Sequence, residues 1–486
     1  MTATLARLVV SEVSLPDTAA SLPISGLTAD SREVKAGYLF AALPGTVVDG
    51  AKFIGQAFER GASAVIAAKG AYKGSGLVIE TSNPRQLFAK AAARFFGKQP
   101  DLAVAVTGTN GKTSVAAFVR EIWQAMGFRA ASLGTVGLVG PGVSEYLSHT
   151  TPDPVQLHGM LAKLSEDHIE HLVLEASSHG LAQFRLDGVR FSAAAFTNLT
   201  RDHLDYHGSV ENYFDAKMRL FEELLPAGAP AVINADTPYG AEAIKRAGTC
   251  GLKIFTVGKL GSGLKLLASR REGFGQHLDV QGPQKRHSVY LPLVGEFQAS
   301  NALVAAGLVI ATGGEETMAL HALESLHGAK GRLELVGKSK TGAPIFVDYA
   351  HTPDALENAV TSLRPYTDGR LVVVFGAGGD RDKGKRPLMG TVAARLADVK
   401  IVTDDNPRTE NASVIRSEIM AACPGAKEIA DRANAILTAV DGLAAGDVLL
   451  VAGKGHEEGQ TVGTTVIPFS DHDAVIAAIQ GEIYHG

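Results

Sequence analysis

The feature of this sequence that most constrains its fold is a glycine-rich loop joining a short apolar strand to a helix. Residues 102–106 read LAVAV, residues 107–113 read TGTNGKT, and residues 114–126 have the composition of a helix. Such a loop lets backbone N–H groups surround a phosphate at a helix N-terminus, where Lys112 would neutralise charge. Thr113 would place its hydroxyl on Mg²⁺. The arrangement predicts an α/β domain that binds a nucleoside triphosphate.

The loop is a shortened variant of the pattern G-x-x-x-x-G-K-[ST], because Val106 stands where that pattern has its first glycine. A glycine-rich turn that merely contains a lysine is the simpler alternative, and the correctly placed strand and helix argue against it. We expect the phosphates to contact Gly108, Thr109, Asn110, Gly111, Lys112, Thr113 and Ser114.

Length, charge and composition exclude several classes of protein. A chain of 486 residues is long enough for about three domains. The net charge of −5 provides no basic field for nucleic acid or an anionic membrane. No apolar run reaches the length of a membrane-spanning helix, and the N-terminal residues lack a secretory leader pattern. Cys250 and Cys423 are too far apart in sequence for a metal-binding spacing. We therefore expect a cytoplasmic protein that binds neither nucleic acid nor membrane.

Alternating β-branched and Ala/Leu-rich stretches predict stacked α/β domains with boundaries near 100 and 331. The predicted domains are 1–100, 101–331 and 332–486. In the third, strands are expected at Ile345–Val347, Leu371–Phe375, Lys400–Thr403 and Asp447–Val451, each followed by a loop rich in Gly, Asp or His. Ligands in open α/β sheets bind at those carboxyl ends. Residues 259–284 are expected to form a β-meander or surface excursion.

Candidate metal ligands lie between the loop and the third domain. Glu175 ends the predicted strand 172–175, and a carboxylate beside a phosphate loop can hold Mg²⁺. His203 is an unusual ligand for this hard cation, and Lys217 lies in a helical stretch. Spacing alone favours a satisfied polar histidine and a solvated lysine at these two positions.

A series of motifs in order along the chain resembles the Mur ligases of peptidoglycan synthesis. The resemblance rests on TGTNGKT (107–113), EASSHGL (175–181), TNLTRDHLDYHG (197–208), YFDAK (213–217), GEFQASN (295–301), GRLE (331–334), VDYAHTPDAL (347–356), GAGGDRDKGKRP (376–387), DDNPR (404–408) and GKGHE (453–457). It implies a three-domain fold with an N-terminal UDP-muramoyl-binding domain, a central P-loop ATPase-like domain and a Rossmann-like C-terminal domain.

The resemblance also implies roles for individual residues. The catalytic residues would be Lys112, Lys217, His203 and Arg332, and the metal sites would involve Thr113, Glu175, His203 and a carbamylated Lys217. Asn301 would lie near adenine, Asp348 at ribose and Arg332 near the transferring phosphate. Ser31 and residues 46–48 would contact the uridine diphosphate, and the muramoyl-dipeptide would be lined by Thr150, Thr151, Ser178, Gln183 and Arg185.

The implied activity is ATP-dependent amide formation with Mg²⁺, serving cell-wall synthesis and hence cell shape and division. The substrates would be UDP-N-acetylmuramoyl-L-alanyl-D-glutamate, activated as an acyl phosphate, and meso-diaminopimelate. The family is typically monomeric. Because the reaction needs residues from all three predicted domains, we expect domain closure, and identical scattering profiles with and without substrates would contradict it.

Diaminopimelate carries a carboxylate that lysine lacks, so its recognition needs a cation. Arg381 and Arg408 each follow a predicted strand, and arginine holds carboxylates bidentately. From the residues alone, Arg408 is equally consistent with a salt bridge to Glu410. The resemblance assigns Arg408 to the ligand, and it completes the pocket with Arg381, Asp405, Asn406, Pro407, Gly453 and Glu457.

Two residues depart from the family pattern. Gln298 replaces the usual asparagine, and Lys330 replaces a proline, which is expected to loosen the hinge between the second and third domains. Folylpolyglutamate synthetases share the shortened loop, but DDNPR (404–408) and the DSR/GTVVDG segment (30–50) argue against them. A GTPase or transport ATPase would use the same loop, but the sequence contains no NKxD-like segment.

Overall fold

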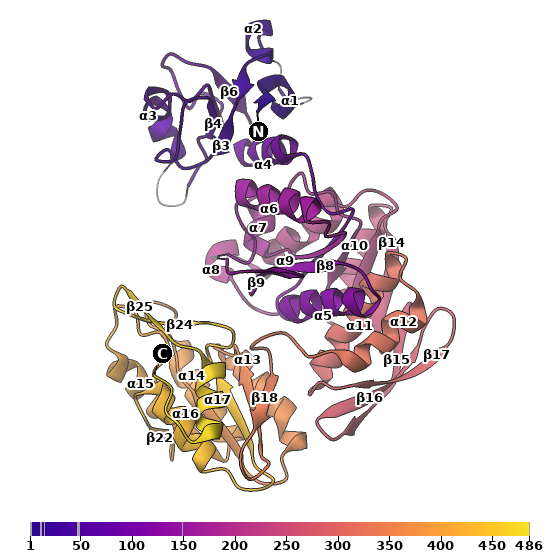
Figure 1. The fold of residues 1–486 in the computed structure, drawn as a ribbon, viewed down its shortest axis with the longest axis vertical. Coiled ribbons are helices and arrows are strands. Elements are labelled where there is room, and N and C mark those ends of the chain that lie inside the picture. The colour runs from indigo at the N-terminus through magenta and orange to yellow at the C-terminus, as the bar shows by residue number, and fades with distance from the viewer. Residues whose placement is uncertain (1, 10–11, 14, 46–48, 148, 486) are drawn as a thin grey trace. The chain divides into compact units, whose positions relative to one another are not determined.

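The computed structural model (Figure 1) describes residues 2–485 except 10–11, 14, 46–48 and 148. The chain divides into two compact units. The first comprises Met1–Leu267, Val280–His287 and Ser300–Ala322, and the second comprises Ala268–Asp279, Ser288–Ala299 and Leu323–Gly486. The boundaries near 100 and 331 that the sequence suggests remain predictions.

The N-terminal part of the first unit is built on a four-stranded parallel sheet of order β3-β4-β5-β6. Its strands are β3 (Gly26–Thr28), β4 (Tyr38–Ala41), β5 (Ala64–Ala68) and β6 (Val78–Thr81). Around them lie β1 (Ala3–Thr4), α1 (Leu5–Val9), α2 (Asp17–Ala20), β2 (Pro23–Ile24), η1 (Gly50–Phe53), α3 (Ile54–Glu59) and α4 (Pro84–Phe96). Burial on both faces explains why β5 is an uninterrupted apolar run rather than an alternating one.

The rest of the first unit is built on parallel strands in the order β8-β11-β7-β12-β13-β14. The bounds are β7 (Leu102–Thr107), α5 (Lys112–Ala125), β8 (Ala130–Gly134), β9 (Gly137–Gly140), β10 (Val143–Glu145), α6 (Pro154–Glu166), β11 (His171–Glu175), α7 (Ser178–Ala182), β12 (Ala193–Phe196), α8 (Leu204–His207), α9 (Val210–Arg219), η2 (Leu220–Leu224), β13 (Pro230–Asn234), α10 (Gly240–Thr249) and β14 (Lys253–Gly258). The predicted strand, loop and helix at 102–126 are confirmed. Because β7 lies between β11 and β12, their carboxyl ends meet around the phosphate loop.

Helix starts in this chain repeatedly use a capping side chain followed by proline. Asn83 caps α4 by accepting from the backbone N–H of Gln86, and Asp153 caps α6 in the same way, each with proline at the next position. The missing N–H of proline costs nothing in the first turn, where that donor has no helical partner. These local signals set the ends of the helices that flank the sheet.

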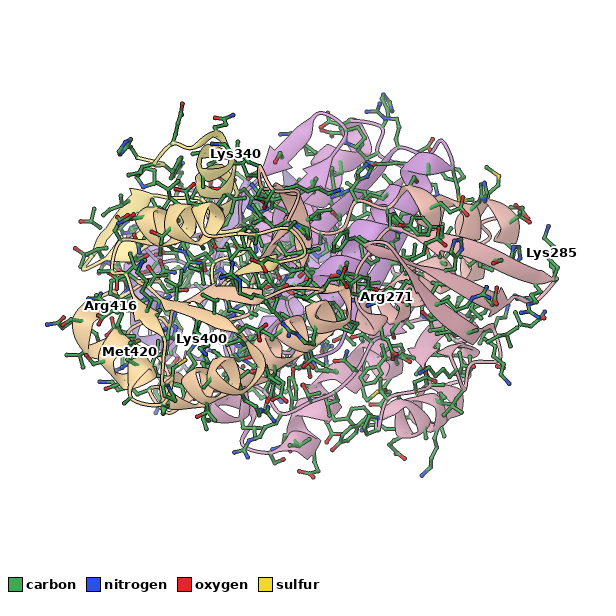
Figure 2. The ribbon with its side chains drawn as sticks, turned by 90° about the horizontal axis from the view of Figure 1, so that it is seen from below. Arg271, Lys285, Lys340, Lys400, Arg416 and Met420 are labelled. Carbon is green, nitrogen blue, oxygen red and sulfur yellow. The ribbon has the colours of Figure 1, made fainter. Side chains whose placement is uncertain are left out.

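A β-rich stretch follows β14, as predicted for residues 259–284. It contains β15 (Leu264–Glu272), β16 (Gly275–Gln281) and β17 (Arg286–Leu291), and Figure 2 labels Arg271 and Lys285 in this region. Then come α11 (Glu296–Ala311), α12 (Glu316–His321) and η3 (Ala322–Ser325).

The second unit contains a six-stranded sheet of order β18-β19-β23-β20-β21-β22, parallel except for the edge strand β18. Its bounds are β18 (Glu334–Lys338), β19 (Pro344–Asp348), α13 (Pro353–Leu363), η4 (Arg364–Tyr366), β20 (Leu371–Phe375), α14 (Lys385–Leu396), β21 (Val399–Val402), α15 (Ala412–Met420), β22 (Lys427–Glu428), α16 (Arg432–Asp441), β23 (Val448–Ala452), the hairpin β24 (Gly459–Val462) and β25 (Thr465–Pro468), and α17 (Asp471–Gln480). All four strands predicted in this region are present. Asp348 is the last residue of β19, and the carboxyl ends of the other three strands lead into the loops that contain Arg381, Arg408 and Gly453.

The loop after β21 is anchored at its start. Arg416 of α15 bonds to Asp404 and, at 2.7 Å, to Glu428 of β22. Figure 2 labels Arg416 and Met420 of α15 and Lys400 of β21. In the part of the chain that the structure describes, no helix is both long and apolar enough to cross a bilayer.

Candidate active site

The phosphate loop is shaped by two glycines whose positive φ and close neighbours disfavour any side chain. Gly108 has φ +150° and Gly111 has φ +87°. A Cβ on Gly108 would lie 1.9 Å from Oγ1 of Thr197, and one on Gly111 would lie 2.3 Å from Oδ1 of Asn301. The second contact places Asn301, a predicted nucleotide residue, directly beside the loop.

The loop is held to the end of the neighbouring strand β12. The N–H of Thr109 donates to the carbonyl of Asn198 at 2.9 Å. The N–H of Asn110 donates to the side-chain Oδ1 of Asn198, also at 2.9 Å. The ammonium of Lys112 lies over the loop and donates to the carbonyls of Gly108 and Thr109 at 3.0 and 2.8 Å. Asn198 therefore supports the loop, a role that sequence analysis did not assign to it.

Glu175 and Thr113 lie together, as a magnesium site beside the phosphate loop requires. Glu175 is buried, and its Oε2 accepts from the hydroxyl of Thr113 at 3.1 Å. Its carboxylate also accepts from the backbone N–H and the hydroxyl of Thr135 at 2.8 and 3.1 Å. Thr135 in turn bonds to Thr150 at 3.0 Å. Sequence analysis missed Thr135, because a threonine forty residues before its partner carries no local signal.

Lys217 is buried, so the solvated-lysine interpretation is wrong. Its side chain is 1% exposed, its Nζ donates to the carbonyl of Gly108 at 2.7 Å, and it lies 4.2 Å from the ring centre of Tyr213. Burial, reinforced by the charge of Lys112, holds the pKa of Lys217 well below its usual value. The hydroxyl of Tyr213 donates to Thr109 at 3.2 Å, which ties α9 to the loop.

His203 lies at the start of α8 in a left-handed conformation, with φ +52°. Its side chain is 47% exposed and its Nε2 is 3.4 Å from Asp202. Its ring centre is 4.9 Å from that of His179 and 6.0 Å from that of Tyr213. Among the described residues no three His, Cys, Asp or Glu side chains form a metal-sized group. The metal ligands predicted from the sequence are not of this kind, because they include a threonine, Thr113, and a lysine, Lys217.

The residues predicted for the muramoyl-dipeptide lie near one another at the ends of β11 and α7. Arg185 donates to the carbonyl of Thr151 at 2.8 Å and to Gln183 at 2.7 Å. The hydroxyl of Thr151 donates to the carbonyl of Glu175 at 3.0 Å. Ser178 is buried in the first turn of α7. Ser31 is buried in the N-terminal part of the unit, and residues 46–48 lie outside the described residues.

The predicted nucleotide residues of the second unit form their own cluster. The guanidinium of Arg332 lies 4.8 Å from the ring centre of Tyr349, and Asp348 accepts from the N–H of Leu333 at 2.6 Å. Burial raises the pKa of Asp348 to about 6, although Arg332 opposes the shift. The amide of Gln298 donates to the carbonyl of Arg332 at 3.2 Å, so this departure from the family pattern supports the backbone here.

Lys330, the second departure, forms an ion pair, and the loosened hinge that it suggests remains a prediction. Its Nζ lies 2.8 Å from Oε1 of Glu458, in the loop before β24. Both groups are largely exposed, so the pair contributes little to stability. It still gives the lysine a defined partner within the second unit.

The loops after β20 and β21 are bonded to one another at the predicted amino-acid site. Nη1 of Arg408 donates to the carbonyl of Gly379 at 2.8 Å, and the N–H of Gly379 donates to the carbonyl of Asn406 at 2.9 Å. A Cβ on Gly379 would lie 1.9 Å from the carbonyl oxygen of Pro407, so the loops approach as closely as backbones can. Arg381 is exposed in the same loop.

Glu410 does not pair with Arg408, so the alternative that the sequence left open is wrong. Oε1 of Glu410 lies 2.9 Å from Arg386, and its Oε2 lies 3.1 Å from Lys383. The hydrogen bond from Arg386 is the main cause that lowers the pKa of Glu410 to about 2. Within the described residues Arg408 forms no ion pair with a carboxylate. Its guanidinium can therefore donate to a carboxylate of a ligand.

The loop after β23 contributes a buried cation that sequence analysis missed. Lys454 is fully buried, and its Nζ donates to Asn406 and to Glu457, both at 3.1 Å. Asn406 also donates to Glu457 at 2.8 Å. The three side chains lock together two predicted ligand residues from different loops.

Asp405 carries a buried acceptor aimed at the same place. Its Oδ2 has no hydrogen-bond partner among the described residues, and a Cβ on Gly453 would lie 2.5 Å from it. Burial alone would raise the pKa of Asp405, but Arg432 and Lys454 hold it below its usual value. Arg432 is itself fixed by Asp471 at 2.7 Å, with both side chains fully buried. The loops after β21 and β23 thus contain a buried carboxylate with a lowered pKa, and the same β21 loop carries the guanidinium of Arg408.

Backbone strain concentrates at these positions. The non-glycine residues with φ between +48° and +59° in the described chain are His168, Phe184, His203, Leu333, Asp380 and Arg408. All but His168 are, or directly adjoin, predicted site residues. Such conformations cost roughly 1–3 kcal/mol each and persist where the surroundings impose them, often at functional sites.

Comparison with known proteins finds similar sequences along most of the chain. Residues 23–97 match the model described as "Mur ligase family, catalytic domain", residues 106–309 match "Mur ligase middle domain", and residues 331–455 match "Mur ligase, glutamate ligase domain". The chain is 57% identical to the UDP-N-acetylmuramoyl-L-alanyl-D-glutamate--2,6-diaminopimelate ligase of Rhizobium meliloti, covering 95% of this chain and 96% of that one. It is 55% identical to the Brucella melitensis protein of the same name, covering 96% of each chain.

Solved structures show the same likeness. A structure of a UDP-N-acetylmuramoyl-L-alanyl-D-glutamate--2,6-diaminopimelate ligase superposes with a TM-score of 0.74 at 32% identity, covering 99% of both chains. A folylpolyglutamate synthase from Mycobacterium tuberculosis superposes with a TM-score of 0.61 at 20% identity, covering 75% of this chain and 91% of that one. The second likeness concerns the fold alone.

Proposed function

The chain belongs to the Mur ligase family, and from this premise we infer that it joins meso-diaminopimelate to UDP-N-acetylmuramoyl-L-alanyl-D-glutamate at the expense of ATP. The new amide forms on the side-chain carboxylate of the D-glutamate, and the product is a peptidoglycan precursor. Full-length relatives named for this reaction carry the inference.

The chemistry explains why so many charged residues are needed. A carboxylate repels an amine and has a poor leaving group, so it must first accept the γ-phosphoryl group of ATP. The amine then attacks the acyl phosphate, loses a proton, and expels inorganic phosphate. Because the protein forms no covalent bond to substrate, its work is positioning and charge neutralisation.

In the first unit, the phosphate loop is proposed to bind the triphosphate. Its backbone N–H groups and the ammonium of Lys112 would face the phosphates, and Asn301 would contact the nucleotide. Thr151, Gln183 and Arg185 would hold the muramoyl-dipeptide near Glu175. The hydrogen bonds that already join these side chains support this proposal, because they hold each one in a defined orientation.

The oxygen atoms of Glu175 and Thr113 suit Mg²⁺, a hard cation that prefers oxygen ligands. When bound, Mg²⁺ would neutralise charge on the phosphates. Glu175 would hold the ion, and Thr135 would keep that carboxylate oriented through its two hydrogen bonds. The family assigns a role at the metal to His203 as well.

Lys217 is proposed to carry a carbamate. Its depressed pKa leaves a neutral amine available, whose lone pair can attack the carbon of CO₂ and release one proton. The product is an anion, which attracts the Lys112 ammonium, whereas an ammonium on Lys217 would repel it. Mass spectrometry of the intact protein under non-denaturing conditions, with isotopically labelled bicarbonate, should find the mass of one labelled CO₂ bound. A protein that is fully active without that mass would contradict the proposal.

In the second unit, Arg332 and Asp348 are proposed to bind the nucleotide, and the loops after β20, β21 and β23 to bind diaminopimelate. Arg408 would hold the distal carboxylate of diaminopimelate, assisted by Arg381. The buried acceptor on Asp405 and the carboxylate of Glu457 suit the ammonium group that lies beside the distal carboxylate of diaminopimelate. Lysine lacks this carboxylate and would leave Arg408 without its partner.

The test is phosphate release from ATP with UDP-N-acetylmuramoyl-L-alanyl-D-glutamate and either meso-diaminopimelate or L-lysine as the amine. Turnover with diaminopimelate alone is the expected result. Turnover with lysine instead would retain the ligase and refute the assignment of Arg408. No turnover with either amine would refute the proposed reaction, and folate-type acceptors would then be tested.

We also propose that the protein acts as a monomer in the cytoplasm, where ATP is supplied. The family resemblance supports this. Sedimentation of the purified chain at its own monomer mass is the expected result, and a stable dimer would contradict it.

A further inference from the structure

A buried arginine connects the helix that carries Lys217 to residues 181–187, which we call the acceptor segment. Arg219 ends α9 and its side chain is 8% exposed. Its Nη2 lies 2.7 Å from Oδ1 of Asp187, whose side chain is 2% exposed, and its Nη1 donates to the carbonyl of Leu181 at 2.9 Å. One guanidinium therefore holds both ends of the acceptor segment.

The same guanidinium supports the strained centre of the segment. Its central carbon lies 4.0 Å from the ring centre of Phe184, a residue with φ +59°. Phe184 stands between Gln183 and Arg185, which are the proposed contacts of the muramoyl-dipeptide. A left-handed phenylalanine is unfavourable unless its surroundings impose it, and Arg219 supplies part of those surroundings.

Further contacts fix the position of the arginine itself. Its Nε lies 2.7 Å from Glu223, one helical turn further on. Asp187 is fixed in turn, because its Oδ1 also accepts from Gln86 of α4 at 2.9 Å. Asp187 therefore has a second anchor in α4, whereas the contact of Arg219 Nε with the half-exposed Glu223 is an ion pair without hydrogen-bond geometry.

We propose that Arg219 is a positioning residue for ligation, which sets the acceptor segment, and with it Gln183 and Arg185, against the helix that carries Lys217. This inference rests on the proposed function, because it assigns the segment to the carboxylate-bearing substrate. Arg219 touches no reacting atom. It acts by fixing where the acceptor carboxylate lies relative to Lys217 and the phosphate loop, and small displacements of reacting groups are costly.

A purely structural role makes a different prediction. A core ion pair that only stabilises the fold would, when removed, lower stability and reduce the active fraction without changing the KM for any substrate. A positioning role changes the KM for one substrate and the kcat of the folded enzyme, and leaves the KM values for the other two unchanged.

The test uses the full chain with Arg219→Met, and the double variant Arg219→Met/Asp187→Asn, which leaves no buried carboxylate without a counter-charge. Arg246→Met is the matched control. Arg246 also pairs with carboxylates, Asp215 of α9 at 2.5 Å and Glu222 at 2.6 Å, and its guanidinium carbon lies 5.3 Å from the ring centre of Phe214. It has no hydrogen bond or ion pair to residues 181–187 in the described structure. Thermal melting, and kcat and KM for each of the three substrates, are measured for every variant.

The expected result for the double variant is a melting transition close to that of the wild type. Its kcat/KM for the UDP-linked acceptor should fall roughly 10–100-fold, with KM values for ATP and diaminopimelate unchanged. The control should match the wild type for all three substrates. A folded double variant with wild-type kinetics toward the UDP-linked acceptor would overturn the proposal, even if Arg219→Met alone failed to fold. An inactive wild-type enzyme would instead refute the proposed function, and this inference with it.

Discussion

Replacing Arg408 by alanine isolates the proposed recognition of the distal carboxylate of diaminopimelate. The backbone of residue 408 is left-handed, with φ +51°, and alanine carries the same Cβ, so the strain is unchanged. The backbone bonds that anchor this residue also remain, from its N–H to Thr461 at 3.0 Å and from Gly463 to its carbonyl at 2.7 Å. The substitution therefore removes the guanidinium and leaves the loop in place.

The expected loss of activity follows from the number of hydrogen bonds that Arg408 can donate to the carboxylate. Arg408 spends one donor on the carbonyl of Gly379 and keeps donors for a bidentate contact with a carboxylate. Two charge-assisted hydrogen bonds at about 1.5 kcal/mol each give about 3 kcal/mol, the lower end of their range because the side chain is only partly buried. At about 1.4 kcal/mol per factor of ten, kcat/KM for diaminopimelate should fall more than about a hundredfold.

The assay is phosphate release at varied diaminopimelate, with the KM for ATP measured in parallel and expected to be unchanged. Any residual turnover with L-lysine should be almost unaffected, because lysine has no carboxylate for Arg408 to hold. The control is Arg395→Ala, which removes an exposed arginine of α14 that pairs with Glu357 at 2.6 Å. Unchanged kinetics with diaminopimelate in the Arg408→Ala variant would refute the reasoning.

Three further predictions concern buried and partly buried polar groups. The pKa of Asp348 rises from 3.8 to about 6 on folding, so the folded state binds this proton more tightly, and stability falls as pH rises through that interval. The loss of folding free energy amounts to up to about 3 kcal/mol, from about 2 pKa units at 1.36 kcal/mol each. Asp348→Asn should therefore stabilise the substrate-free protein in urea melts above pH 6 but not below pH 3.8. Equal effects at both pH values would contradict this prediction. Arg432→Met leaves Asp471 buried and unpaired and should cost about 3–5 kcal/mol in the same melts, whereas the double variant with Asp471→Leu should recover most of it. Thr135→Val removes the hydroxyl donor to Glu175 and should lower kcat roughly tenfold or more without changing stability by a comparable amount; a wild-type kcat would show that Thr135 does not orient that carboxylate.

Much of the fold and part of the site were predictable because their signals are local. The strand, glycine loop and helix at 102–126 are contiguous in sequence, and the four strands of the second unit are apolar runs that end at polar loops. In a parallel sheet, carboxyl ends of neighbouring strands share an edge. Glu175 could therefore be placed beside the phosphate loop from its position at a strand end alone.

The remaining features depended on tertiary structure, because the groups that create them are far apart in sequence. Lys217 is buried against Gly108, more than a hundred residues earlier, so its helix alone indicates an ordinary solvated lysine. Glu410 follows Arg408 by two residues but pairs with Arg386, because the chain turn at residue 408 directs the two side chains to different partners. Local sequence specifies where strands and loops begin and end, whereas the burial, charge state and strain of a side chain are set by whichever distant groups the fold brings against it.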